Sequence, residues 1–203
     1  VFRVEGVAGQ GLSVELEAMR LGGRLDAAVS LVDAAGFVLR SCDDVAFARQ
    51  DPAFSVELPA DGPYFIRVRQ AAYRGDKDDH YLLHVGAFPR PLSLLPLGGA
   101  AGEPLEVELL GEAGSLGSGT VQVPVGGTHG GWVPPGAAAV PVELGGETAP
   151  TPCWIRPSPL PNVMESADGS VTSFAAPAAL SGRLESERDT DRFSFEVEAG
   201  KRY

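Results

Sequence analysis

Apolar residues recur at every second position in short stretches of this chain, and helical spacing is almost absent. Phe54, Val56 and Leu58 alternate with Ser55 and Glu57. Because successive side chains of a β-strand point to opposite faces, this pattern gives a strand one apolar face. Turns rich in Gly and Pro separate such runs about every 8–12 residues, a spacing typical of β-sandwiches and barrels. The sequence therefore predicts an all-β fold.

Two pairs of runs before residue 88 are predicted to form hairpins. The run 54–58 and the run that starts at Tyr64 flank a Pro/Asp/Gly turn, which is typical of a hairpin. Gly36, which can take positive φ, is predicted to close a second hairpin between 29–33 and 37–40. Further strands are predicted at 14–18 and 80–86.

Proline-rich segments divide the chain into predicted domains. Pro89-Arg90-Pro91 is predicted to be a stiff linker, because each Pro fixes φ and disfavours helix before it. Short strand-like runs follow, up to a second Pro-rich segment at 157–161. The predicted division is a β-sandwich at 1–88, a smaller β spacer at 89–161, a polar linker at 162–177 and resumed strand character at 178–203.

Acidic residues outnumber basic ones 27 to 16, and the formal net charge is −11. Neutralising phosphates requires clustered Lys and Arg, so nucleic acid and anionic membrane surfaces are poor partners for this chain. No apolar run approaches the roughly 20 residues of a membrane-spanning helix. The first residues lack the basic start and apolar stretch of a signal peptide, so we expect any signal to lie upstream.

The two ends of the chain share a pattern. Phe-Arg-Val at 2–4 and Phe-Ser-Phe at 193–195 are each followed, at the same spacing, by Ala-Gly and then by an apolar residue, Leu12 or Tyr203. The second copy is preceded by a strand-like run at 180–184 and by Asp189-Thr190-Asp191, which the first copy lacks. The repeat predicts that 1–88 lacks its first strand and that 178–203 opens a second, truncated domain of the same kind.

Several motifs resemble the bacterial pre-peptidase C-terminal (PPC) domain family. The resemblance covers nearly all of 1–88 and all of 180–203, and Asn162–Glu165 resembles the segment that leads into such domains. The middle unit, about 90–160, resembles Ig-like spacers more loosely. The motifs in the first domain are Leu25-Asp26, Val29-Ser30-Leu31-Val32-Asp33, Gly36, Asp43-Asp44, Leu58-Pro59-Ala60-Asp61-Gly62-Pro63-Tyr64 and Tyr81-Leu82-Leu83.

The resemblance implies a jelly-roll-like β-sandwich, followed by a smaller Ig-like β-unit and an incomplete β-sandwich. It also implies a non-catalytic interaction or spacer module of a large secreted or cell-surface bacterial protein. Its partners would be neighbouring domains of the same chain. The alternative function is an accessory domain that binds a polysaccharide or protein substrate for a secreted peptidase.

Calcium is the cofactor that the resemblance suggests. Related domains bind calcium through acidic residues of the lead-in segment, where this chain keeps Glu165 and offers Asp168 as a partial substitute. Asp189 and Asp191 match an Asp-x-Asp pair, and residues two apart on a strand share a face. The alternative is that these acids cap turns. Because most lead-in ligands are missing, we expect calcium to stabilise the chain barely.

Other chemistry finds little support in the sequence. Trp132, in a Gly/Pro-rich loop, is a candidate for contact with a ligand or partner, because an aromatic face can stack on a sugar ring. No Gly-x-Ser-x-Gly motif is present, and no catalytic residues are predicted. Cys42 and Cys153 fall in different predicted domains, which leaves two thiols or an interdomain bridge as alternatives.

Overall fold

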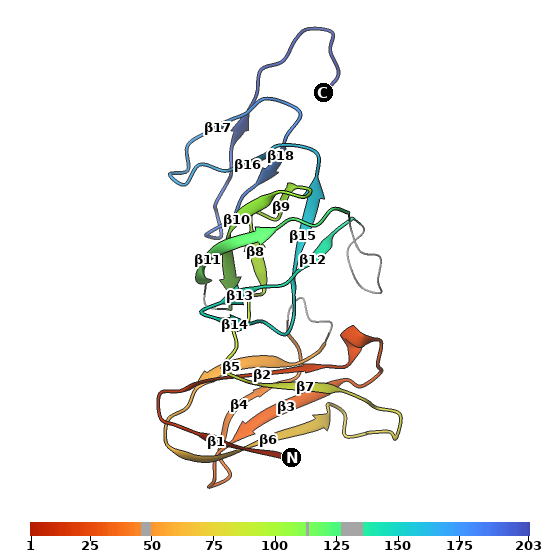
Figure 1. Cartoon of the computed structure of the whole chain (residues 1–203), viewed down its shortest axis with the longest axis vertical. Helices are drawn as coiled ribbons and strands as arrows, with labels where there is room; N and C mark the ends of the chain where they lie inside the picture. Colours follow the sequence, from red (N-terminus) through yellow and green to blue (C-terminus); the bar gives the residue numbers. More distant parts are fainter. Residues whose placement is uncertain (46–49, 113, 127–135) are drawn as a thin grey trace. The chain divides into compact units, whose positions relative to one another are not determined.

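The computed structural model describes residues 1–45, 50–112, 114–126 and 136–203 (Figure 1). The fold is all-β and of the β-sandwich type, as the alternation of apolar residues predicted. The one helical element among the described residues is a 3₁₀ turn, η1, at Met19–Leu21. The chain divides into two compact units, Val1–Arg90 and Pro91–Tyr203.

The first unit is a sandwich of two antiparallel sheets. One has the strand order β1-β6-β3-β4 and the other β5-β2-β7. The strands are β1 (Phe2–Gly6), β2 (Gly11–Glu17), β3 (Ala27–Val32), β4 (Val38–Cys42), β5 (Ala53–Glu57), β6 (Gly62–Gln70) and β7 (Leu82–Gly86).

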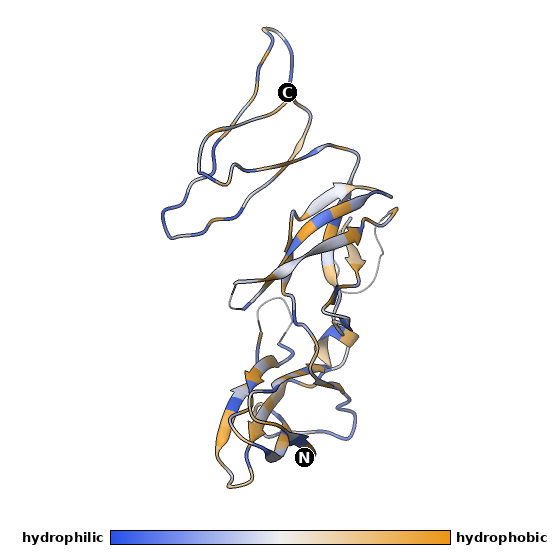
Figure 2. Ribbon diagram, turned by 60° about the vertical axis from the view of Figure 1, so that its left-hand side comes forward, coloured by the Kyte–Doolittle hydropathy of each residue, from blue (hydrophilic) through white to orange (hydrophobic). Residues whose placement is uncertain are grey.

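The core of the first unit lies between these sheets. Val14, Leu16, Leu31, Phe54 and Ile66 are fully buried and come from four different strands. Burying a side chain of this size contributes about 1.5–3 kcal/mol. Their packing is what holds the two sheets face to face, and hydrophobic residues (orange) recur along these strands in Figure 2.

The predicted hairpin between 54–58 and the run from Tyr64 is wrong. β5 pairs with β2, whereas β6 pairs with β1 and β3, so the chain crosses from one sheet to the other at this turn. The turn bonds instead to the turn after β1, where Gly9 N donates to Leu58 O (2.8 Å) and Leu58 N donates to Gln10 O (2.9 Å). Two amphipathic strands bury their apolar faces equally well when stacked, so alternation does not specify side-by-side pairing.

The predicted hairpin around Gly36 is confirmed. β3 and β4 pair as antiparallel neighbours, and Gly36 has a φ of 93° between them. Asp33 Oδ1 accepts hydrogen bonds from the backbone N–H groups of Ala35 and Phe37, which fixes the turn.

The second unit contains a smaller pair of sheets. Their strand orders are β11-β10-β8 and β12-β15-β9, and β15 runs parallel to β9. Leu94, Val123, Val140 and Ile155 are fully buried in a core of their own. The strands are β8 (Ser93–Leu95), β9 (Gly98–Ala100), β10 (Pro104–Gly111), β11 (Gly114–Gln122), β12 (Ala138–Val140), β13 (Glu143–Leu144), β14 (Glu147–Thr148) and β15 (Cys153–Ser158).

Residues 162–203 differ from the rest of the second unit, because none of their side chains is buried. They form two short parallel pairs, β16 (Asn162–Met164) with β18 (Ala179–Ser181) and β17 (Thr172–Ser173) with β19 (Phe193–Ser194). The first strand of each pair falls in the predicted linker. Figure 1 shows this segment (blue) as long loops with a few short arrows. Its exposed apolar residues are Met164, Val171, Leu180, Leu184, Phe195, Val197 and Tyr203.

Across the described ranges, no helix has the length and apolar character needed to cross a membrane.

Candidate functional site

Three of the four predicted acidic residues line one small pocket in the C-terminal segment. Glu165, Asp189 and Asp191 line it together with Glu185. Glu165 directly follows β16, and Asp189–Asp191 lie just before β19. The parallel pairs β16–β18 and β17–β19 bring Glu165 close to Asp189–Asp191. A side chain at Gly182 would collide with the Asp191 carboxyl, so glycine at this position leaves room for the acids to approach.

These carboxyls form two hydrogen-bonded pairs. The hydrogen bond with Asp191 raises the pKa of Glu165. The backbone N–H of Arg183 donates to Glu165 Oε1 (2.5 Å) and lowers this pKa by a smaller amount. The hydrogen bond with Asp189 raises the pKa of Glu185 and lowers the pKa of Asp189, which also accepts from the N–H groups of Glu185 and Thr190. Two carboxyls this close favour a shared proton, because like charges disfavour joint ionisation.

Asp168 does not line the pocket and serves its own loop instead. Its Oδ1 accepts hydrogen bonds from Ser166 Oγ (2.7 Å) and from the Ser170 N–H (3.0 Å). These bonds stabilise the charged carboxylate, and they lower the pKa of Asp168 to about 2. In this structure Asp168 therefore has the contacts of a turn cap, the alternative that the sequence left open beside calcium binding.

The described residues hold no group of three or more His, Cys, Asp or Glu side chains arranged to bind a metal ion. Calcium takes six to eight oxygen ligands, and each carboxyl pair at the pocket supplies two side chains. Calcium binding at Glu165, Asp168, Asp189 and Asp191 therefore remains a hypothesis from the sequence. The comparison that tests it is the melting temperature in calcium against chelator.

Trp132 lies outside the described residues, so its contact with a ligand stays a prediction. The alternative function, accessory binding of a polysaccharide or protein substrate, stays a prediction too. Both cysteines are thiols: Cys42 is half-buried in the first unit and Cys153 is buried in the second. Burial raises the pKa of Cys153 to about 11, so this thiol is a poor nucleophile at neutral pH.

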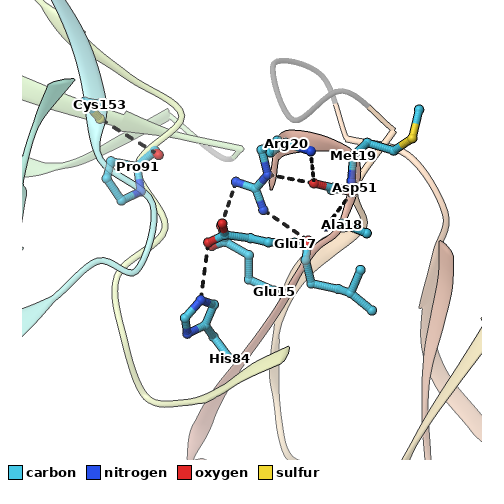
Figure 3. Close-up of polar contacts among 10 residues, drawn as sticks. Glu15, Glu17, Ala18, Met19, Arg20, Asp51, His84, Pro91 and Cys153 are labelled. Atoms are coloured by element: carbon cyan, nitrogen blue, oxygen red, sulfur yellow. Dashed lines mark hydrogen bonds and ion pairs between the residues drawn. The ribbon is translucent and has the colours of Figure 1, made fainter. Parts of the chain in front are cut away.

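Sequence reasoning missed a buried charged cluster in the first unit (Figure 3). Asp51 is fully buried and accepts hydrogen bonds from the backbone N–H groups of Ala18, Met19 and Arg20 and from Arg20 Nε (3.0 Å). Arg20 also donates to Glu15 Oε1 (2.9 Å), and Glu15 is itself buried. Burial alone lowers the pKa of Arg20. The interactions with Glu15 and Asp51 together raise it by more, so the pKa of Arg20 is raised overall.

The hydrogen bonds of this cluster connect the turn after β2 to Asp51, which lies two residues before β5. It satisfies three backbone N–H groups of η1 and its N-terminal flank, which a turn this short leaves without helical partners. No local signal predicted it, since Asp51 stands in Gln-Asp-Pro, an ordinary turn sequence, and Glu15 occupies a polar position of an alternating strand. These contacts assign the cluster a structural role in holding the turn.

Comparisons with protein-family models, with curated proteins and with solved structures each gave no match to this chain.

Proposed function

We propose that this chain is a non-catalytic interaction and spacer module of a larger secreted or cell-surface bacterial protein. The observation that carries the proposal is the C-terminal segment, 162–203, whose strands are paired but which buries no apolar side chain. A strand pair without a core is only marginally stable in water. Such a segment suits contact with further β-structure.

The arrangement of the two cores supports the spacer part of the proposal. The first unit packs its core from strands β2 to β6, and the second packs a separate core from β8 to β15. Units with their own hydrophobic cores can in principle fold independently, which is what a spacer built of successive domains requires. The similarity to PPC domains supports the same function, because those domains recur in large surface proteins.

Forced unfolding of single molecules tests this function. With handles at both ends, we expect two separate unfolding events, each releasing at most about 3.3–3.6 Å of chain per residue of the unit that opens. Ile155→Ala should weaken the event of the second unit alone, because Ile155 is buried in that core. One cooperative event for the whole chain, or turnover in a panel of peptide, ester and glycoside substrates, would contradict the proposal.

A further inference from the structure

β11 is an edge strand that lacks side chains at two inward positions. Among the described residues it pairs with β10 alone, in the sheet order β11-β10-β8 (Figure 1). Gly119 lies opposite Val107 and Gly117 opposite Leu109, so both glycines stand beside buried residues of the second core. A Cβ at Gly119 would meet no heavy atom within 4 Å. Glycine inside a strand often marks a place where another backbone or a ligand approaches closely.

A groove opens at Gly119. Its volume of about 320 Å³ falls within the roughly 300–1,000 Å³ range of ligand pockets. The buried side chains of Val107, Val140 and Val142 contribute its apolar lining, and Thr148 stands at its exposed rim. Because facing sheets normally pack closely, the missing side chain of Gly119 accounts for this space.

The backbone of β11 has unpaired groups next to this groove. Val123 N donates to Glu103 O (3.0 Å), and bonded pairs alternate with non-bonded pairs along an antiparallel ladder. Pro104, which has no N–H, occupies the next, non-bonded position. By this alternation Ser118 and Thr120 direct their N–H and C=O groups away from β10. No backbone hydrogen bond joins these groups to another part of the described chain, so the edge is open to a further strand.

The outer face of the sheet is acidic beside this edge. Glu106 lies opposite Thr120 and Glu108 opposite Ser118, so two small side chains separate the carboxylates from the edge. Thr120 Oγ1 donates to Glu106, and Arg183 Nη1 lies 3.4 Å from Glu108 Oε2, so a cation of the chain already lies at one end of this row. The predicted β spacer contains six Glu and no Asp, against two Arg and no Lys. The charge complement of this face is therefore a basic segment.

We propose that this edge binds an extended peptide that carries one apolar side chain between two basic ones. The peptide pairs with β11 as an added strand, and Ser118 and Thr120 supply the backbone hydrogen bonds. Its apolar residue lies opposite Gly119 on the inward face and enters the groove. Its two neighbours lie on the outer face, where Lys or Arg reaches Glu106 and Glu108 across the small side chains.

The groove, the open backbone and the acidic row together favour this occupant over others. A small apolar molecule would fill the groove but leave the backbone groups of β11 unpaired. A strand alternates its side chains between two faces, so one peptide satisfies all three features at once. A second copy of this chain is a poorer occupant, because its one basic-apolar-basic run, Arg67-Val68-Arg69, lies within β6 and pairs with β3.

Peptide titration of the full chain tests the proposal. The probe is the capped peptide Ser-Thr-Lys-Leu-Lys-Thr-Ser, and ¹H–¹⁵N NMR spectra follow its binding. We expect saturable shifts that are largest at the amides of Ser118 and Thr120. An Ala in place of the central Leu should weaken binding about tenfold, because less apolar surface is buried in the groove. A probe with Glu in place of both Lys should not bind.

Gly119→Val tests the groove from the side of the protein. Its side chain occupies the groove, and a Cβ at this position meets no neighbour, so we expect the fold to be kept and binding to weaken about tenfold or more. Gly11→Val is the matched control: it lies in β2 of the first unit, where a Cβ also meets no heavy atom within 4 Å, and binding should be unchanged. Glu106→Gln should weaken binding about threefold and reduce its salt dependence.

No saturable shift at the β11 amides, equal binding of the Leu and Ala probes, or unchanged binding by Gly119→Val would overturn the proposal. Self-association of the chain that Gly119→Val abolishes would assign the edge to a second copy and would overturn it too. The proposal does not depend on segment 162–203, so its failure leaves the two events expected in forced unfolding unaffected.

Discussion

Asp51 is a buried acidic residue whose hydrogen bonds hold part of the first unit together. Its carboxylate is fully buried and bonds to three backbone N–H groups and to Arg20, which also bonds to the buried Glu15. A buried charge is tolerated where its partners are complete, and removal of one partner leaves the others uncompensated.

We predict that Asp51→Ala destabilises the first unit by about 3–5 kcal/mol, because it leaves the Arg20 guanidinium and the turn donors without their acceptor. Urea unfolding followed by circular dichroism measures this loss. Glu5→Ala is the control: it breaks the exposed ion pair with Arg3 and should cost less than about 1 kcal/mol. Equal effects of the two substitutions would contradict the role assigned to Asp51.

Asp168 gives a prediction about pH. Its pKa is lowered from 3.8 to about 2 by hydrogen bonds from Ser166 and Ser170. Since the folded value lies below the unfolded one, the order of this loop is favoured above pH 3.8 and lost as the pH falls toward 2. The carboxyl ¹³C shift should therefore titrate near 2, and Ser166→Ala should raise the midpoint. A midpoint near 3.8 in the unaltered chain would be inconsistent with the loop geometry.

Residues that follow the alternation were predictable, and residues that depart from it were not. Phe54 and Ile66 lie in the core, as their positions indicated. Glu15 is buried although it occupies a polar position of β2, because Arg20 folds over it from the next turn. A contact between a strand and a turn leaves no periodic signal in either segment.

At the scale of elements, most strands of the first unit were predictable, and their pairing was less so. The hairpin of β3 and β4 is local and follows from Gly36. The crossing between β5 and β6 and the parallel pairing of β15 with β9 depend on partners distant in sequence. The resemblance placed Glu165 and Asp191 in one site, and the structure brings them together. The hydrogen bond from Arg183 N to Glu165 and the space that Gly182 leaves for the Asp191 carboxyl have no signal in the sequence.

Gly6 tests the packing at the end of β1. A Cβ at this position meets the side chains of Leu58 and Tyr64, so Gly6→Ala should destabilise the first unit by about 1–3 kcal/mol. Gly11→Ala is the matched control, since a Cβ at Gly11 meets no heavy atom within 4 Å, and it should change stability by no more than about 0.5 kcal/mol. Urea midpoints compare the two. A neutral Gly6→Ala would contradict the close packing of Gly6 against Leu58 and Tyr64.

The whole molecule combines two packed cores with a segment that has none. Strands of the first unit close around Phe54, and those of the second around Leu94 and Ile155. Residues 162–203 pair their strands but bury no side chain: Tyr203 is 58% exposed, whereas its counterpart Leu12 is 6% exposed. This contrast identifies the segment as an element that gains its stability from contact with other β-structure.

Hydrogen exchange of the full chain, at a dilution where it is monomeric, tests that contrast most directly. We predict strong protection of amides in β2, β3, β6, β10 and β15, because opening them requires the loss of a core. Amides of β16 to β19 should exchange nearly as fast as an open chain. Protection of β17 and β19 comparable to that of β6, in the monomer, would contradict the account.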